Sequence, residues 1–172
     1  MQGDKLILVD EDDRPVGTEE ELVCHQGDGI LHRAFTILII NARGEYLLQR
    51  RSGDKLLWPL CWETTCSGHP RVGEDLEEAA GKRLAEELGF SVAMRDVGRF
   101  IYKVAYDGAG IEWEVCHLLV GSFDGEARPD AAEVAEVRHV DLATLQAEIA
   151  ASREEYAPWL EPALDTWVKV VE

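Results

Sequence analysis

Five imidazole and carboxylate side chains have the types and spacing of a metal site. Three of the five histidines, His25, His32 and His69, lie in loop or strand-edge contexts rather than inside apolar runs. Glu112 and Glu114 are two residues apart, so in a β-strand they share a face and repel each other unless a cation or proton lies between them. Such nitrogen and oxygen donors suit zinc, manganese or magnesium. Taken singly, a loop histidine is most often a surface residue, and Glu-x-Glu on a strand is usually a solvated face.

A second chemical signal is the acidic helix expected within residues 58–90. The segment reads as a strand end, then a turn containing glycine and proline, then a helix. The helix is expected to begin at Glu74 or Asp75, where a carboxylate meets the positive end of the helix dipole. It is expected to stop at Gly89, because glycine is the common residue just beyond a helix C-terminus.

Glu87 falls inside the apolar arc of this predicted helix, which also contains Leu76, Ala80 and Leu84. An unpaired ionised carboxylate on a buried face is costly, so Glu87 needs a cation nearby. Arg83, one turn earlier on the same side, is one candidate, and a metal ion is the other. The helical pattern favours neither.

Basic residues gather near the same segment although the chain carries a net charge of −17. This charge argues against nucleic acid as a partner, because phosphates would be repelled. An anion site in this chain must therefore be locally basic or filled by a metal. Arg50, Arg51 and Lys55, which close a strand and open a loop, favour anion binding, whereas Arg71 fits a binding and a surface role equally well.

The segment resembles the Nudix box, a loop–helix motif that holds magnesium against a diphosphate. The matching positions are Gly68, Glu74, Leu84, Glu86, Glu87, Gly89 and Phe90. Two positions depart from the hydrolase form of the box: Lys82 stands in place of an arginine, and Arg83 in place of a catalytic glutamate. A basic residue there, together with His-Pro after Gly68, is similar to the type I isopentenyl diphosphate isomerases.

This resemblance covers most of the chain, from His25 to Trp159, and implies two metal sites. In that family the residues in these contexts hold a second divalent metal, Mn²⁺, Mg²⁺ or Zn²⁺; here they are His25, His32, His69, Glu112 and Glu114. The resemblance implies that Glu87 holds Mg²⁺ bridging the diphosphate. It implies a single substrate class, a small prenyl diphosphate, interconverted between its isopentenyl and dimethylallyl forms in isoprenoid biosynthesis.

The resemblance also assigns roles around the substrate. Glu114 would be the acid/base on one face, Tyr102 would hydrogen-bond near it, and Trp159 would stabilise the cationic carbon. From the residues alone, Trp159 is better explained as a core anchor of the last helix. The diphosphate and the rest of the substrate would be contacted by Arg51, Lys55, Arg83 and His69.

Three positions depart from the isomerase pattern. Ser67 stands where the family has its second acid/base, a cysteine, and Cys66 is one residue earlier. In an extended segment Cys66 points away from Ser67, although a bulge would bring it into the pocket. Ser67 therefore predicts slower isomerisation, since a hydroxyl is a far weaker acid than a thiol. Glu21 replaces a lysine that meets the diphosphate, and Thr64 replaces an asparagine.

Two alternatives remain open from the sequence. A Nudix-type Mg-dependent diphosphohydrolase, acting on a prenyl or nucleoside diphosphate, would use Glu86 and Glu87 to activate water. Arg83 argues against it, and a five-ligand second site has no obvious purpose in a hydrolase. The other alternative is a binding module that keeps the pocket but not the rate.

The composition is that of one domain spanning residues 1–172, with 46% hydrophobic and 30% charged residues. No apolar run approaches the ~20 residues of a membrane span and the N-terminus is no signal peptide, so we expect a cytoplasmic protein without membrane contacts, as a monomer. In that compartment the cysteines are expected to be free thiols. These are Cys24, Cys61, Cys66 and Cys116.

The order of predicted elements indicates a mixed α/β (α+β) sandwich of the Nudix-like kind, with the loop–helix motif at its centre and helices at the C-terminus. The clearest hairpin signal is in residues 34–51, around the turn Asn41–Gly44. Strands are also expected at 6–10, in two or three pieces between 90 and 123, and at 137–141. Helices are expected at 142–152 and from about Pro158 onward.

Overall fold

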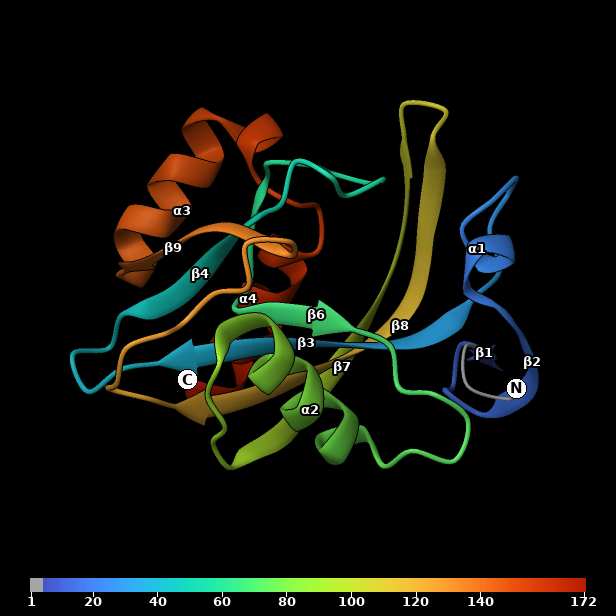
Figure 1. The fold of residues 1–172 in the computed structure, drawn as a ribbon, viewed down its shortest axis with the longest axis horizontal. Helices are drawn as coiled ribbons and strands as arrows, with labels where there is room; N and C mark the ends of the chain where they lie inside the picture. The colour runs from blue at the N-terminus through green and yellow to red at the C-terminus, as the bar shows by residue number, and fades with distance from the viewer. Residues whose placement is uncertain (1–4) are drawn as a thin grey trace.

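A central strand, β3 (His32–Ile40), organises the sheet seen in Figure 1. The computed structural model describes residues 5–172. β3 is buried over most of its length, which fits a strand covered on both faces. It has parallel and antiparallel neighbours. It runs parallel to β8 (Gly110–Ser122) and antiparallel to β1 (Lys5–Val9), β4 (Tyr46–Arg51) and β6 (Cys66–Gly68).

The remaining strands extend the sheet on both sides of β3. A long antiparallel hairpin is formed by β7 (Met94–Tyr106) and β8, and β9 (Val134–Val140) lies against β4. The strand bounds are β1 Lys5–Val9, β2 Pro15–Glu20, β4 Tyr46–Arg51, β5 Trp62–Glu63, β6 Cys66–Gly68, β7 Met94–Tyr106 and β9 Val134–Val140.

Helix α2 (Leu76–Leu88) covers one face of the sheet and begins and ends where local signals require. The Asp75 carboxylate accepts hydrogen bonds from the backbone N–H groups of Glu77 and Glu78, so Asp75 is the N-cap. Gly89 adopts φ 73°, the left-handed conformation typical of a glycine C-cap.

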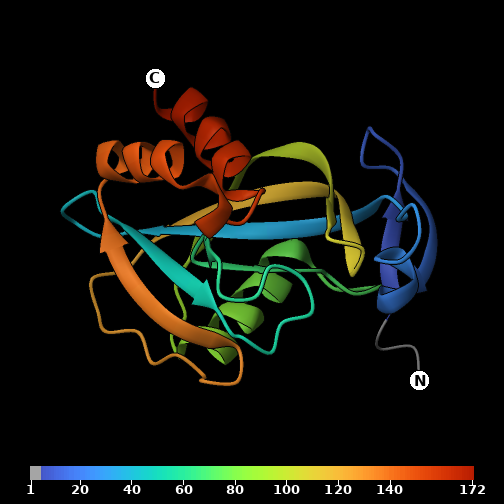
Figure 2. The same cartoon turned by 90° about the horizontal axis from the view of Figure 1, so that it is seen from above.

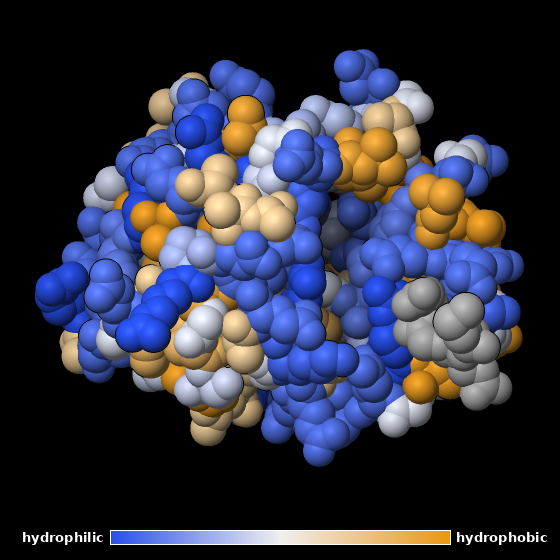
Figure 3. Space-filling model, viewed as in Figure 1, coloured by the Kyte–Doolittle hydropathy of each residue, from blue (hydrophilic) through white to orange (hydrophobic). Residues whose placement is uncertain are grey.

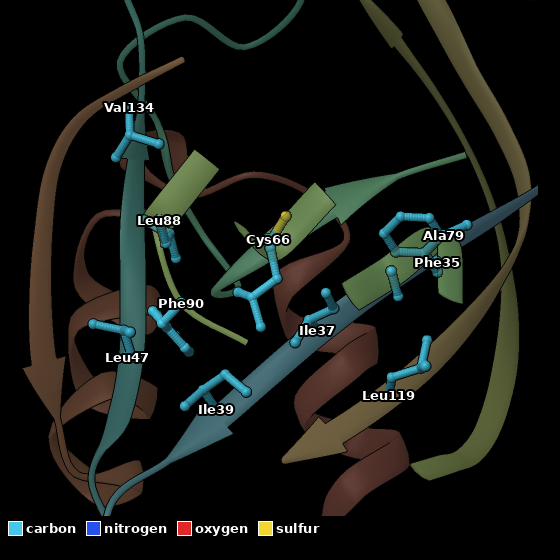
Figure 4. Packing of buried hydrophobic residues seen from close by; sticks show 12 residues of the cluster. Phe35, Ile37, Ile39, Leu47, Cys66, Ala79, Leu88, Phe90, Leu119 and Val134 are labelled. Carbon is cyan, nitrogen blue, oxygen red and sulfur yellow. The ribbon is translucent and has the colours of Figure 1, made fainter. Parts of the chain in front are cut away.

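Two C-terminal helices, α3 (Leu142–Ala151) and α4 (Leu160–Val171), cover the opposite face (Figure 2). The two largest hydrophobic clusters of the described residues lie one beneath α2 and one beneath α3 and α4. Figure 4 shows the first, in which Cys66 lies among Ile37, Leu47 and Leu88. The second contains Leu38, Leu118 and other residues of the central strands packed against the C-terminal helices. No described helix is long and apolar enough to cross a membrane.

The predicted α+β class and its order of elements are confirmed, apart from the following differences. The predictions missed β2 and the short helix α1 (Glu21–Cys24). The hairpin at 34–51 exists, but only two residue pairs join β3 to β4, while nine join β3 to β8. Residues 90–123 form two strands, β7 and β8, in agreement with the two or three expected there. The last helix begins at Leu160, so Pro158 precedes it.

Candidate active site and metal centre

Strand register places the acidic end of β8 beside polar residues of both its neighbours. Glu114 lies opposite His32 on β3 and opposite Tyr102 on β7. The Tyr102 hydroxyl donates to Glu114 Oε2 at 2.7 Å, and His32 Nε2 lies 3.4 Å from Glu114 Oε1. All three side chains are therefore fixed by sheet pairing rather than by a flexible loop.

The two other histidines reach the same place from segments outside the β3–β8 pair. His25, which ends α1, is held to β8 because its Nδ1 lies 3.0 Å from the Ile111 carbonyl oxygen. His69 follows β6, and its Nε2 lies 2.8 Å from Glu114 Oε1. Ligand atoms of the three histidines and Glu112 all lie within 4.8 Å of one another. We call these four residues together with Glu114 the His/Glu centre.

The histidines of this centre are oriented in one common way. Nδ1 of His32 lies 2.7 Å from the Ile30 carbonyl oxygen, and Nδ1 of His69 lies 3.5 Å from Glu21 Oε1. With the contact from His25 to Ile111, each imidazole thus has an oxygen beside Nδ1. Such outer contacts are typical of histidine ligands, since they fix the ring and leave Nε2 for a metal.

The two carboxylates of the centre differ in how readily they ionise. Burial and the neighbouring Glu114 raise the pKa of Glu112 well above its usual value. Burial also opposes ionisation of Glu114, but hydrogen bonds with His32 and His69 outweigh it and hold its pKa well below the usual range. The surroundings therefore favour the ionised form at Glu114 and the neutral form at Glu112.

Glu112 carries the clearest sign that the centre fits a cation. Its Oε2 is buried and has no hydrogen-bond partner among the described residues. His25 Nδ1 lies 3.3 Å from it but is directed to the Ile111 carbonyl oxygen. A buried oxygen without a partner is costly, and a divalent ion among these nitrogen and oxygen donors would satisfy it.

Protonation of His69 depends on the same neighbours. Burial lowers the pKa of this imidazole, but the hydrogen bond with Glu114 and the closeness of Glu21 raise it to about 10. The pKa of Glu21 is held well below its usual value by His69, with Arg71 adding to the effect. A metal binding at Nε2 of His69 must displace this proton.

The His/Glu centre opens into a cavity of about 1110 Å³. Figure 3 shows this face of the molecule hollowed near its middle, with hydrophilic residues around the opening. Tyr102, Ser67 and Trp159 line the cavity beside the centre. Burial, together with the charge of Glu114, raises the pKa of the Tyr102 phenol well above its usual value, so Tyr102 remains a donor.

The basic residues predicted to contact a diphosphate line the cavity, but each is paired with a carboxylate. Lys55 forms an ion pair with Glu133, and Arg83 Nη2 lies 2.9 Å from the same carboxylate. Arg51 Nη1 donates to Glu63 at 2.9 Å. Glu133 and Glu63 gave no signal in the sequence, because their partners are far away along the chain.

Of two further arginines considered from the sequence, one lines the cavity and the other does not. Arg71, which fitted two roles equally, lines the cavity and donates to Glu21 at 2.7 Å. Arg50 was expected to favour anion binding, but it is not among the cavity residues in the described part of the chain. Its guanidinium lies 3.8 Å from Glu136 and donates to the Leu60 carbonyl oxygen.

Glu87 lies behind Arg83 rather than at the cavity wall, with only 3% of its surface exposed. Its Oε1 lies 2.7 Å from Arg83 Nη2, while Oε2 accepts from Gln49 at 2.8 Å and from the Cys66 thiol at 3.3 Å. Burial raises the pKa of Glu87, although Arg83 opposes this. Of the two cations considered for Glu87, the structure contains the arginine.

Ser67 and Cys66 point to opposite sides of β6, as an extended segment requires. Cys66 is fully buried in the core beneath α2, where burial raises the pKa of its thiol well above the usual value. Ser67 lines the cavity, and its Oγ lies 2.9 Å from the hydroxyl of Thr36 and 3.2 Å from that of Thr64. No bulge brings Cys66 into the pocket.

Gly68 allows β6 to pass close to β3 at this point. A Cβ at this position would lie 2.8 Å from Cζ of Phe35, closer than side chains tolerate. Phe35 lies opposite Gly68 in the sheet, so the glycine lets His69 follow directly into the centre. This need for close approach explains a glycine at this position of the motif.

Comparisons with known proteins agree with this geometry. The NUDIX domain profile matches residues 30–160, so the fold and site define a NUDIX protein. A solved structure from Deinococcus radiodurans superposes with a TM-score of 0.77 at 20% identity, covering 95% of this chain and 99% of that one. A MutT protein from Methanosarcina mazei gives a TM-score of 0.60 at 21% identity, covering 68% and 81%. At such identities these likenesses concern the fold alone.

Sequence relatives define the family more narrowly. An isopentenyl-diphosphate Delta-isomerase of Nocardia farcinica is 44% identical over 92% of this chain and 91% of its own length. One from Burkholderia multivorans is 40% identical over 95% of this chain and 97% of its own length. The chain belongs to the isopentenyl-diphosphate Delta-isomerase family of NUDIX proteins. This confirms the resemblance seen in the sequence.

Proposed function

We propose that this protein interconverts isopentenyl and dimethylallyl diphosphate, as a cytoplasmic enzyme of isoprenoid biosynthesis without a nucleic-acid partner. The observation that carries the proposal is the His/Glu centre, in which Glu114 lies among imidazoles and a tyrosine hydroxyl at the wall of a cavity. Membership of the isomerase family supports the same reaction.

Two groups on the cavity wall have the positions to move protons. Isomerisation adds a proton to the terminal carbon of the double bond. It then removes a proton from the CH₂ group attached to the inner carbon of that double bond. We assign one transfer to Glu114 and the other to Ser67. The hydrogen bond from the Tyr102 hydroxyl influences how readily Glu114 gives up or accepts its proton. Thr36 and Thr64, both fully buried, orient the Ser67 hydroxyl.

The cation formed between the two proton transfers needs protection from water. Trp159 offers an aromatic face at the cavity, and Trp58 packs edge-on against it with ring centroids 5.6 Å apart. An aromatic face attracts positive charge, most strongly where water is excluded. We therefore assign stabilisation of the cationic carbon to Trp159.

The residues fit a divalent metal in the His/Glu centre, since that ion would satisfy the bare Glu112 oxygen. A bound divalent cation would hold Glu114 in place and compensate the charge of both carboxylates. We propose Mn²⁺, Mg²⁺ or Zn²⁺ there, with His25, His32, His69, Glu112 and Glu114 as the residues that hold it.

A second cation, Mg²⁺, is proposed at Glu87 only together with the diphosphate. Both Glu87 oxygens already have partners, so the carboxylate requires no metal on its own. A diphosphate would compete for Arg83 and thereby free Glu87 Oε1. Arg51, Lys55 and Arg83 would contact the phosphate oxygens, and His69 would lie beside the bound substrate.

A diphosphohydrolase is the second candidate and has less support. Arg83 occupies the position at which the hydrolase motif has a glutamate, and Glu87 is turned away from the cavity. Of Glu86 and Glu87, only the half-exposed Glu86 lines the cavity. A single carboxylate would therefore have to activate water.

One experiment separates the candidates. Purified protein is incubated with isopentenyl diphosphate, Mg²⁺ and Mn²⁺ in heavy water, and deuterium in the allylic product is followed by NMR. Incorporation without release of phosphate is the expected result. Release of phosphate or pyrophosphate would instead mean a hydrolase, and neither product would mean a binding protein.

A further inference from the structure

A buried carboxylate behind the cavity wall joins two of the residues placed at the substrate. Glu63, on β5, has 2% of its surface exposed and is not among the cavity-lining residues of the described chain. Its Oε1 accepts from Arg51 Nη1 at 2.9 Å, and its Oε2 accepts from the indole Nε1 of Trp159 at 2.9 Å. Each oxygen thus has its own donor.

The fold creates this contact over a long distance in sequence. Trp62 pairs with Tyr156 in an isolated parallel bridge, and the Ala157 N–H donates to the Trp62 carbonyl oxygen at 2.8 Å. The chain entering α4 is thereby held along β5, so Glu63 meets an indole 96 residues away.

Trp159 is under the influence of two opposite charges. The Arg51 guanidinium carbon lies 5.1 Å from the indole ring centroid. A cation on the ring uses the same π-electron density that a cationic carbon in the cavity would need. The carboxylate of Glu63 counteracts this effect, because it pairs with Arg51 and also accepts the indole N–H in a charge-assisted hydrogen bond.

Arg51 does not depend on Glu63 alone for its position. Its Nε donates to the carbonyl oxygen of Trp58 at 3.1 Å, and its Nη2 to that of Leu57 at 3.0 Å. These bonds hold the loop before β5 whatever occupies position 63. The bond to the indole is therefore the contact through which Glu63 affects the cavity wall most directly.

We propose that Glu63 is a positioning residue for Trp159, fixing the plane of its indole and keeping the ring rich in electrons toward the substrate's cationic carbon. This inference rests on the proposed isomerase function. It adds a residue that does not touch the substrate but sets how well Trp159 stabilises the positive charge formed during the reaction.

A double-mutant cycle tests the coupling. Glu63→Gln keeps the size of the side chain but removes its charge, and Trp159→Phe removes the indole N–H while keeping an aromatic ring. We expect Glu63→Gln to lower kcat by about tenfold with little change in KM. In the Trp159→Phe background the same change should have almost no further effect on kcat. An equal loss in both backgrounds, or a rise in KM at unchanged kcat, would place the action of Glu63 on Arg51 and overturn the proposal.

An NMR measurement tests the contact without any turnover. The indole N–H resonance of Trp159 is identified by its loss in Trp159→Phe, and that of Trp58, the matched control, by its loss in Trp58→Phe. The Trp159 resonance should move upfield in Glu63→Gln, while that of Trp58 stays in place; an unmoved Trp159 resonance contradicts the proposal. If Glu63→Gln does not fold, Glu63→Asp, which shortens the side chain, replaces it in both measurements.

These two readouts also separate the proposal from the function on which it rests. A wild-type protein that exchanges no deuterium into isopentenyl diphosphate would contradict the isomerase assignment. The indole resonance would still report whether Glu63 controls Trp159.

Discussion

Two clusters of histidine and carboxylate lie on opposite faces of β8 and differ in how well their polar atoms are satisfied. On one face, the His/Glu centre contains a buried Glu112 oxygen without a hydrogen-bond partner in the described chain. On the other, His117 lies between two carboxylates, with Nε2 2.8 Å from Asp13 and Nδ1 2.6 Å from Asp96. Arg33 Nε completes this Asp13 cluster by donating to Asp13 at 2.8 Å.

The difference distinguishes a candidate metal site from a structural contact. In the Asp13 cluster, the carboxylate of Asp13 has basic partners in Arg33 and His117. These contacts connect the β1–β2 turn to β3 and β8. The His/Glu centre places two carboxylates side by side and leaves one buried oxygen without a hydrogen-bond partner in the described chain, which a bound cation would satisfy. The presence of histidine and acid together is thus less informative than whether their donors and acceptors balance.

Glu114→Gln is expected to have the largest effect of the variants that test this comparison, and the effect is on the isomerisation rate. The amide cannot take up and return a proton, so isomerisation should fall by about 10²- to 10⁴-fold. Deuterium exchange measures the rate, and thermal unfolding checks that the variant is folded. His117→Gln, on the opposite face of the same strand, is the matched control and should retain the wild-type rate. An undiminished rate in Glu114→Gln would remove this residue from the proton transfer.

Metal affinity distinguishes the two clusters more directly. Glu112→Gln should weaken Mn²⁺ binding by about 10- to 100-fold. The substitution removes the negative charge and replaces one carboxylate oxygen by an amide nitrogen, which is a poor metal ligand. Equilibrium binding followed by electron paramagnetic resonance of free Mn²⁺ measures this without turnover. His117→Gln should leave the affinity unchanged. If both variants lose Mn²⁺ affinity, or if only His117→Gln does, then the His/Glu centre is not distinguished from the Asp13 cluster by metal binding.

Ser67→Cys sharpens the comparison by separating proton transfer from metal binding. A thiol, with an ordinary pKa of about 8.5, is a stronger acid than a hydroxyl, so turnover should rise by about tenfold. Mn²⁺ affinity should stay as in the wild type. The introduced thiol should also be alkylated by iodoacetamide with loss of activity, unlike the buried Cys66. Unchanged or lower turnover would show that Ser67 does not transfer the proton.

The elements with local signals were predictable from the sequence. Asp75 and Gly89 mark the ends of α2 by capping chemistry that acts within a few residues, and Glu87 was correctly expected to lie on its apolar side. β2 escaped prediction because nearly all its residues are exposed, so it has no alternation of apolar and polar side chains. The parallel pairing of β3 with β8 was also missed, since only the nearby hairpin partner leaves a signal in the turn.

The candidate site was predictable only as a set of residue types. His25, His32 and His69 come from three separate segments, and nothing in their spacing requires them to meet; the family resemblance supplied that expectation. Glu63 and Glu133 could not be found in this way, because their partners are brought to them by tertiary folding. Which carboxylates neutralise the basic residues of the cavity can therefore be learned only from the structure.

The smallest effect is expected at the Asp13 cluster and concerns stability alone. Partial burial opposes ionisation of Asp13, but the contacts with Arg33 and His117 outweigh it and hold its pKa below the ordinary 3.8. Because the folded value is the lower one, ionised Asp13 stabilises the fold fully above the pKa of the unfolded chain, and this contribution is lost as pH falls through the folded pKa. Asp13→Asn should therefore lower Tm by a few degrees at neutral pH, and the gap to the wild type should close as the pH falls below about 4. Calorimetry across this range measures the gap, with Asp12→Asn, an exposed neighbour, as the control. A gap independent of pH would mean that the shape of the side chain, and not its charge, joins the β1–β2 turn to β8.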